Sequence, residues 1–339
     1  MTSAKHPPQP LHIPYEALES AADWFAQLRA DQSDAATHAA WQRWLNASEH
    51  HRQAWRYVDL VSASFQSMRQ PDNAAIGEAA LQSLRVARVS RRRALGAIGL
   101  LGGSGLLTWA SWKASPLPYL AAYWMADFRT ATGETRTVQL ADGSQVWLNT
   151  DSAIDTAYTP HERLLRLTRG EILIQTSGQA DQAGLRPFRV ATREGRIDAL
   201  GTRFDVRQFD AITRVAVFEG AVAIQPAAGG TRRLLHAGEA ASFDRVAIGA
   251  THAADSAQEA WHQGVLLAEN MSLGEWVDEL GRYRRGHLSV DPAVSDLRVL
   301  GSFPTADTDL ALTLLEQALP VRVHRRFGWW TTIGPRPVT

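Results

Sequence analysis

The segment that most constrains the fold starts with arginines and continues as a long run without charge. Arg91, Arg92 and Arg93 precede residues 94–112, which contain no charged side chain. As a helix, these roughly 19 residues would extend about 28 Å, close to the roughly 30 Å hydrocarbon core of a bilayer. The alternative is a buried core helix, but five glycines in the run would weaken it. The segment therefore predicts a transmembrane helix.

The charges on the two sides of this segment differ. Five arginines lie between residues 85 and 93, whereas only Lys113 follows the segment closely. Because cytoplasmic flanks are rich in arginine and lysine, we expect a single-pass protein of the inner membrane, with its N-terminus in the cytoplasm and its C-terminus in the periplasm. Arg91, Arg92 and Arg93 are either this topology determinant or a twin-arginine export signal, here as an uncleaved signal-anchor.

Length and composition leave room for packed domains on both sides. The chain has 339 residues, 45% of them hydrophobic, and 35 basic residues balance 35 acidic ones, so no net charge indicates a nucleic-acid partner. Cysteine is absent, which excludes disulfides, thiolate metal sites and a catalytic cysteine. We expect a multidomain fold with a disordered tail at 1–14, a small all-α bundle at 15–89, the single transmembrane helix at 94–112, an all-β domain at 126–250 and an α+β domain at 261–335.

The N-terminal bundle contains the first candidate binding residues. Leu18, Ala21 and Phe25 repeat with helical spacing, and Ser48 can cap a later helix. Each tryptophan here either fills the core or contacts a partner. Adjacent histidines do not face each other on a helix, so no metal site is expected. The candidate contact residues are Trp41, Arg43, Trp44, His50, Arg52 and Trp55.

Residues 126–250 alternate apolar and polar side chains, which predicts strands. Val138 and Val146 flank an Asp142-Gly143 turn, which is typical of a hairpin. The same strand–Gly–strand pattern recurs around Arg169-Gly170 and Glu219-Gly220. The repetition predicts an all-β sandwich or a short β-solenoid.

The period changes after residue 260. Ser272 is expected to cap one helix, and Asp307 or Thr308 a second. Strands are expected at 287–290, 298–303 and 321–333, the last as a hairpin, which gives two βαβ-type halves. Asp278 and Glu279 are helix neighbours expected on a solvated face. No hydrolase, nucleotide-binding or zinc motif is present, so neither a conventional enzyme nor a cofactor is expected.

Several segments together resemble the FecR-type regulators. The helical part has Trp24, then W-x-x-W-L at 41–45 and H-R-x-A-W at 51–55. The β part has "LADGSQVWLNTDSAI", "LTRGEILIQT" and "VAVFEGAVAI", and the C-terminal part, with "LGEWVDELGRYRRGHLSVDP", is similar to the short N-terminal domain of secretins and TonB-dependent proteins. The resemblance covers nearly the whole chain.

This resemblance implies a transmembrane anti-sigma factor. Its helices would bind an extracytoplasmic-function sigma factor in the cytoplasm. Its periplasmic part would receive a signal from the signalling domain of a TonB-dependent outer-membrane transducer, in iron or other nutrient uptake. Periplasmic and intramembrane proteases would link the two events. The residues assigned to contact with the transducer are Trp276, Tyr283 and Arg284.

The bond between Gly201 and Thr202 resembles the site at which some FecR-like regulators cleave themselves. The Thr202 hydroxyl would attack the Gly201 carbonyl, and glycine tolerates the strained backbone that this requires. The alternative is a turn that packs Phe204 into the β core.

A second function class stays open. The chain could be an inner-membrane-anchored protein that binds periplasmic polysaccharide, which would need exposed aromatic pairs on the β domain. Only Trp147 stands out there.

Overall fold

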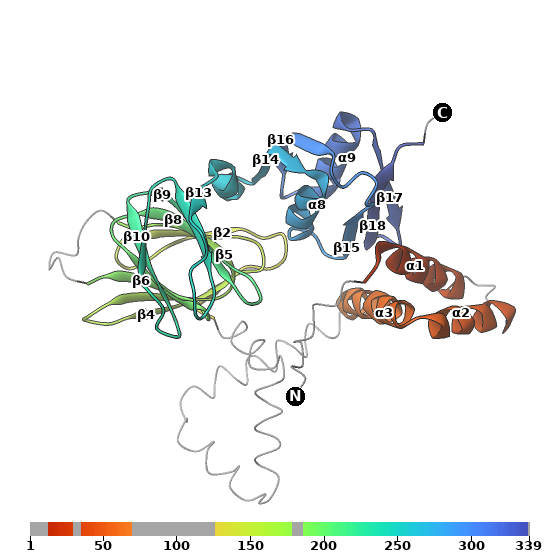
Figure 1. Ribbon diagram of the computed structural model, residues 1–339, viewed down its shortest axis with the longest axis horizontal. Coiled ribbons are helices and arrows are strands. Elements are labelled where there is room, and N and C mark those ends of the chain that lie inside the picture. Colours follow the sequence, from red (N-terminus) through yellow and green to blue (C-terminus); the bar gives the residue numbers. More distant parts are fainter. Residues whose placement is uncertain (1–12, 30–34, 70–125, 178–185, 338–339) are drawn as a thin grey trace, which may run out of the picture. The chain divides into compact units, whose positions relative to one another are not determined.

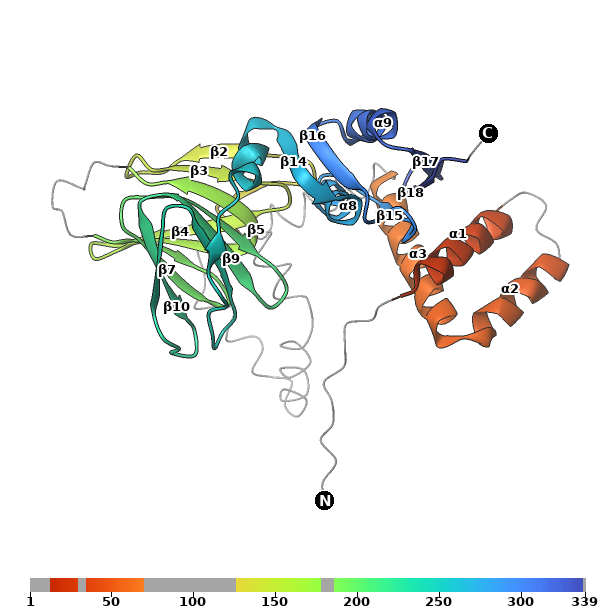
Figure 2. The same cartoon turned by 45° about the horizontal axis from the view of Figure 1, so that its top comes forward.

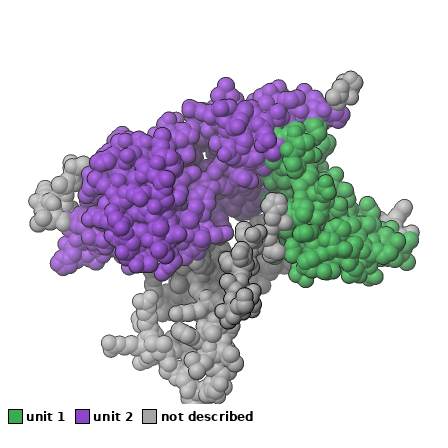
Figure 3. Space-filling view, in the orientation of Figure 1, with its two compact units in different colours: residues 1–100, 286–294, 324–335 green, residues 101–285, 295–323, 336–339 purple. Residues whose placement is uncertain are grey.

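The structure is a computed structural model that describes residues 13–29, 35–69, 126–177 and 186–337. They belong to two compact units, coloured separately in Figure 3. The first unit comprises residues 1–100, 286–294 and 324–335, and the second comprises residues 101–285, 295–323 and 336–339.

Three helices form the N-terminal part of the first unit (Figure 1): α1 (Tyr15–Arg29), α2 (Ala35–Ala47) and α3 (Glu49–Arg69). Ala21 and Ala22 of α1 and Ala54 of α3 are fully buried, and their small side chains allow the two helices to approach closely. The predicted cap at Ser48 is confirmed, because Ser48 Oγ accepts a hydrogen bond from the backbone N–H of His50 at 3.1 Å.

Strands near the C-terminus complete the first unit. They are β15 (His287–Val290), β18 (Trp330–Pro335) and the end of β17 (Val321–Arg326), and β15 pairs with β18 in parallel. Trp329 and Trp330 are buried in the same hydrophobic cluster as Phe25 of α1. Arg326 Nη1 lies 2.5 Å from Asp23 Oδ1. Residues from both ends of the described chain therefore share one core.

A curled β domain forms most of the second unit. Within the described residues its strands are β1 (Phe128–Arg129), β2 (Arg136–Gln139), β3 (Gln145–Leu148), β4 (Ala153–Tyr158), β5 (Arg163–Gln175), β6 (Phe188–Ala191), β7 (Gly195–Ala199), β8 (Arg203–Gln208), β9 (Thr213–Glu219), β10 (Ala221–Pro226), β11 (Arg233–His236), β12 (Glu239–Phe243) and β13 (His252–Ala253). They make two layers around one apolar core: β1-β4-β5-β6-β7-β10-β11 and β2-β3-β5-β8-β9-β12-β13. Figure 2 shows β3 and β10 in different layers.

Strand β5 belongs to both layers. Its first half pairs with β4 and β6, and its second half pairs with β3 and β8. Between the halves, Gly170 has a φ of +89°, and a Cβ atom there would lie 2.2 Å from Ser152 Oγ. The strand bends at this residue because glycine adopts the left-handed conformation without strain and leaves the space that Ser152 occupies.

The structure confirms one predicted hairpin and corrects the other two. Strands β2 and β3 pair around Asp142-Gly143, with Val138 opposite Val146. Arg169-Gly170, in contrast, lies inside β5, and Glu219-Gly220 joins β9 to β10, which belong to different layers. In sequence, a corner between layers resembles a hairpin because both favour glycine with positive φ.

The remaining elements of the second unit mix helices and strands. They are the 3₁₀-helix η3 (Ser256–Gln263), β14 (Val265–Ser272), α8 (Leu273–Gly281), β16 (Arg298–Pro304) and α9 (Thr308–Ala318). Strands β14 and β16 pair antiparallel. The predicted caps are confirmed: Ser272 and Glu275 form a capping box at α8, and Asp307 accepts a hydrogen bond from the N–H of Leu310 at 2.9 Å.

The expected fold class is wrong in its transmembrane helix. In the described ranges no helix has the length and apolar content that a bilayer crossing needs, and the longest, α3, has 21 residues of which several are charged. The described chain instead has N-terminal helices and a large curled β domain. The expected segment 94–112, with Arg91, Arg92 and Arg93 before it, lies outside the described residues, as do residues 70–89.

Candidate functional site

The tryptophans of the three helices contact one another. The ring centroids of Trp41 and Trp55 lie 5.0 Å apart, and those of Trp24 and Trp44 lie 6.4 Å apart. Trp44 also stacks on His51 at 4.5 Å, with an angle of 8° between the rings. Trp41, Trp44 and Trp55 are all half-buried, so these candidate contact residues also hold the helices together.

The polar candidates of the same helices lie further out. Arg43 and His50 are exposed, and Arg52 is half-buried and forms an ion pair with Glu49 at 2.6 Å within α3. Further along α3, Leu60 leaves 69% of its surface exposed. Arg43 and His50 are therefore the candidate residues that a partner could reach without disturbing the helices.

Of the residues assigned to the transducer contact, Trp276 and Tyr283 are buried in the second unit and Arg284 is half-buried. Trp276 is fully buried and packs edge-on against Phe303, with ring centroids 5.0 Å apart. Tyr283 is 6% exposed and belongs to a hydrophobic cluster. The Arg284 side chain is 10% exposed and lies 3.5 Å from Asp309. All three stabilise the folded unit.

Gly201 and Thr202 form a corner between β7 and β8, which belong to different layers. Gly201 has a φ of +80°, and Leu200 before it is 60% exposed. Thr202 is only 4% exposed. Its N–H donates to Thr176 Oγ1 at 2.8 Å, and its carbonyl accepts from the N–H of Thr176 at 3.0 Å. A Cβ atom at Gly220 would lie 2.3 Å from the Gly201 carbonyl oxygen, so glycine at 220 leaves room for this corner.

The hydroxyl of Thr202 distinguishes this corner from similar ones. Positive-φ glycines mark four of the places where the described chain passes between the layers, at residues 170, 201, 220 and 238. The residues that follow them are Glu171, Thr202, Ala221 and Glu239. Only Thr202 offers a hydroxyl. Its Oγ1 is buried, and within the part of the chain that the structure describes it has no hydrogen-bond partner, which is uncommon for a buried hydroxyl.

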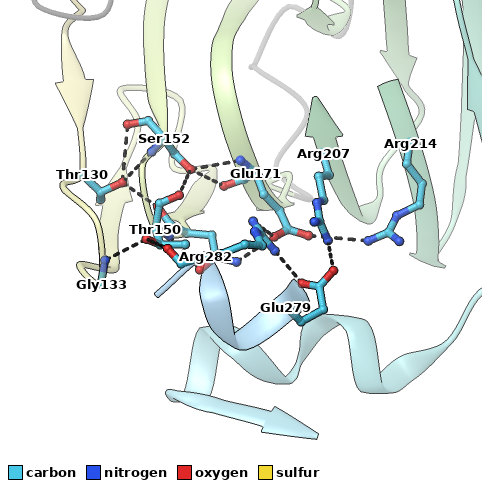
Figure 4. A network of polar contacts seen from close by, with 10 residues as sticks. Thr130, Gly133, Thr150, Ser152, Glu171, Arg207, Arg214, Glu279 and Arg282 are labelled. Atoms are coloured by element: carbon cyan, nitrogen blue, oxygen red, sulfur yellow. Dashed lines mark hydrogen bonds and ion pairs between the residues drawn. The ribbon is translucent and has the colours of Figure 1, made fainter. Parts of the chain in front are cut away.

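A network of charged side chains joins the β domain to α8 (Figure 4). Arg282 Nη2 lies 2.6 Å from Glu171 Oε2 of β5, and Arg282 Nη1 lies 2.9 Å from Glu279 Oε2. Glu279 also lies 2.5 Å from Arg207 of β8, and Arg214 of β9 lies 3.8 Å from Glu171. The Glu171 side chain is 2% exposed. We call these five residues the Glu171 network.

Burial and neighbouring charges act in opposite directions in this network. Burial raises the pKa of Glu279, but the guanidinium groups of Arg282 and Arg207 outweigh it and lower that pKa to about 2. Asp205 of β8 is 1% exposed, and burial, followed by the charge of Glu171, raises its pKa well above the usual range. The network thus keeps Glu279 ionised, whereas the buried carboxyl group of Asp205, which feels the charge of Glu171, resists ionisation.

The sequence did not reveal this network. Asp278 is exposed, as expected, but Glu279 forms two ion pairs in place of the expected solvation (Figure 4). Glu171 and Arg282 are 111 positions apart, and no periodicity relates them. The one signal was a charged residue, Glu171, placed directly before the apolar residues 172–174 of a strand.

The surroundings of the network do not resemble a sugar site. A cavity of about 440 Å³ is lined by four arginines and one aromatic residue, Phe209. The polysaccharide alternative uses the aromatic residue Trp147. The guanidinium of Arg203 lies over the Trp147 ring, 5.2 Å from the ring centroid, and the ring centroid of His262 lies 5.5 Å from that of Trp147. Exposed aromatic pairs, which that alternative requires, are absent from these linings.

Two protein families match parts of the chain. The family described as FecR protein matches residues 126–223, which lie in the β domain. A domain of unknown function, DUF4880, matches residues 19–61, which lie in α1 to α3. No curated protein is similar enough in sequence to match.

Two solved structures are similar in fold. Both are crystal structures of a proposed anti-sigma factor from Parabacteroides distasonis, at 1.65 Å and 2.50 Å resolution. The first is 22% identical with a TM-score of 0.50, and the second is 23% identical with a TM-score of 0.49; each comparison covers 61% of this chain and 97% of the other. The helical region and the FecR region occur in the predicted order, so the predicted resemblance to FecR-type regulators is confirmed for residues 19–61 and 126–223.

Proposed function

We propose that this FecR-like chain is an anti-sigma factor, and that α1, α2 and α3 bind an extracytoplasmic-function sigma factor. The observation that carries the proposal is the combination of a FecR region with a separate helical region in one chain. The similar fold of a proposed anti-sigma factor supports it. The exposed side chains Arg43 and His50 are the first candidates for the contact.

Capture of sigma factors by the full chain tests this function. The sigma factors of the same genome are offered one by one, and we expect one of them to bind selectively. Arg43→Glu should weaken that binding about tenfold, because charge reversal replaces attraction with repulsion at the contact. Arg166→Glu reverses an exposed charge on β5 and serves as the matched control. A folded wild-type chain that binds no sigma factor would show that the proposal is wrong.

We further propose that the second unit receives the signal from the signalling domain of a TonB-dependent outer-membrane transducer in nutrient uptake, iron uptake above all. Among the described strands, β14 and β16 pair only with each other, so each has an open edge. Open edges bind partners by strand addition. On β16, Leu300 is 77% exposed and could anchor such a partner.

Titration of the full chain with a purified transducer signalling domain tests the receiving surface. Leu300→Glu should weaken binding about tenfold, because it places a charge in an apolar contact. Leu234→Glu alters a side chain of β11 that is 44% exposed and provides the control. Equal binding by both variants and the wild type would exclude β16 from the contact.

We propose an inner-membrane location for this role, and regulated proteolysis as the link between the signal and sigma-factor release. The two proposed partners support this location, because one chain must reach both a sigma factor and the signalling domain of an outer-membrane transducer. Separation of cells into membrane and soluble fractions, followed by immunoblotting, tests the location. A chain found only in the soluble fraction would contradict it.

We also propose that the chain cleaves its own backbone between Gly201 and Thr202. The buried, unpaired hydroxyl of Thr202 supports this reaction. Thr202 Oγ1 would attack the Gly201 carbonyl carbon to form an ester, while the hydroxyl proton passes to the Thr202 nitrogen as the C–N bond breaks. Water then hydrolyses the ester and leaves a carboxylate at Gly201 and a free amino group at Thr202.

Intact-mass measurement of the purified full chain tests self-cleavage. We expect one fragment that ends at Gly201 and one that begins at Thr202. Thr202→Ala should leave the chain intact because no nucleophile remains, whereas Thr202→Ser should still cleave. Cleavage of the Thr202→Ala variant at the same bond would assign the cut to a contaminating protease.

A further inference from the structure

The side chain of Arg203, directly after Thr202, is held by residues of η3. Its Nε lies 2.9 Å from Glu259 Oε2, and only 14% of the arginine side chain is exposed. Its Nη1 donates to Gln175 Oε1 at 3.1 Å, and its guanidinium lies over the ring of Trp147. Arg203 is therefore fixed from several sides at once.

The element that holds Arg203 is itself well anchored. Asp255 caps η3 by accepting a hydrogen bond from the N–H of Ala257 at 2.9 Å. Trp261 is 5% exposed and packs in a cluster with Leu173 of β5. Glu259 thus projects from a helix that is packed onto the outer face of the β domain.

The backbone on either side of Arg203 is held less regularly. The register between β8 and β9 shifts between Arg203 and Phe204, so the strand ladder is interrupted there. A Cβ atom at Gly201 would meet no described atom within 4 Å, so packing does not restrain that side of the glycine, whose carbonyl oxygen lies close to Gly220. Besides this contact, Thr176 anchors the peptide by bonding to Thr202, and Glu259 anchors it by pairing with Arg203.

We propose that Arg203 and Glu259 are positioning residues for cleavage at Gly201–Thr202, and that the docked η3 helix is required for the reaction. The ion pair holds the backbone after Thr202 so that the Thr202 hydroxyl faces the Gly201 carbonyl. Because η3 leads directly into β14, a partner that pulls on β14 would also move Glu259 and change the cleavage rate. This inference rests on the self-cleavage proposed above.

The test compares cleavage rates in the full chain. Arg203→Gln and Glu259→Gln should each slow cleavage about 10- to 100-fold, because small misplacements of reacting groups cost that much. The double variant Arg203→Glu with Glu259→Arg restores an ion pair and should recover most of the rate. Glu162→Gln is the matched control, since Glu162 pairs with Arg189 at 2.6 Å elsewhere in the β domain. Melting temperatures show that each variant folds.

The outcomes separate this inference from the reaction itself. If the wild type cleaves and Glu259→Gln cleaves at the same rate, the positioning role is wrong and self-cleavage stands. If the wild type stays intact, self-cleavage is wrong and the positioning role fails with it. If both single variants are slow but the double variant does not recover, the effect does not come from the ion pair, and the positioning role is also overturned.

Discussion

His287 illustrates how burial alone changes a single side chain. It is 8% exposed and stacks on Trp330, with ring centroids 3.8 Å apart. Its Nδ1 lies 3.4 Å from the hydroxyl of Tyr57. Burial lowers the pKa of His287 from 6.5 to about 4, because the charged imidazolium would lose its hydration.

This burial predicts a loss of stability in mild acid. Between pH 6.5 and about 4 the unfolded chain binds a proton at His287 and the folded chain does not, so the free energy of unfolding falls as the pH falls through this window. The full effect is at most about 3 kcal/mol. His287→Phe keeps an aromatic ring and should remove this part of the pH dependence, as measured by urea unfolding at pH 7 and pH 4.5.

The exposed residue His161 provides the comparison. His161→Gln changes this exposed ring and is unfolded under the same two conditions as the control. If His287→Phe kept the full pH dependence, then His287 would not be the neutral buried group that the structure shows.

At the scale of elements, β5 determines the shape of the β domain. One strand serves both layers only because it bends at Gly170, where the φ is +89° and Ser152 lies directly against the backbone. A straight strand of the same length would extend a single layer. The core between the layers depends on that bend, because β5 contributes residues to it from both halves, among them Leu165 and Ile174.

Gly170→Ala should therefore lower the free energy of unfolding by about 3 kcal/mol, from the left-handed backbone together with the clash. Gly229→Ala separates the two causes. Gly229 has a similar φ of +83° but no described atom within 4 Å of the added Cβ, so we expect a loss of only about 1 kcal/mol. Equal losses in urea unfolding would show that the clash with Ser152 has no cost.

At the scale of the whole molecule, the Glu171 network attaches α8 to the β domain. Removing one partner of a buried ion pair leaves the other charge unpaired, which is costly. Glu279 has two arginine partners, Arg207 and Arg282, so it is the most connected acid of the α8 side.

Glu279→Gln should weaken the attachment of α8 to the β domain by about 2 kcal/mol. Breaking a fully buried ion pair costs about 3–5 kcal/mol, and we expect less here because the Glu279 side chain is 26% exposed. The expected observation is faster limited proteolysis between β12 and β14, with the β domain itself intact. Asp278→Asn changes the exposed neighbour on the same helix and should not alter the digestion rate. Identical digestion of both variants would argue against the network as an attachment.

The first unit makes a second prediction at this scale. The ion pair of Arg326 with Asp23 joins α1 to the end of β17. Because the chain has no cysteine, cysteines introduced at 23 and 326 can be cross-linked selectively. We expect a short bis-maleimide to join them in the purified full chain. Failure to cross-link in a folded chain would contradict the shared core of the two ends.

Features that depend on a few neighbouring residues could be predicted from the sequence. The caps at Ser48, Ser272 and Asp307 and the Asp142-Gly143 hairpin are confirmed, since the groups that form them lie within a few positions of one another. The resemblance to FecR-type regulators could also be predicted from the sequence, and it is confirmed. Its motifs are short and contiguous, so they can be read without knowledge of the tertiary structure.

Only the tertiary structure decided which glycines are corners, which acids are buried and which tryptophans are covered. Gly170 and Gly220 look like hairpin glycines until their strands are assigned to layers, and Glu279 looks solvated until Arg207 is placed beside it. Trp276 likewise looked available to a partner but is fully buried. In each case the deciding contact comes from a distant part of the chain, and the periodicity of a segment carries no information about which distant segment packs against it.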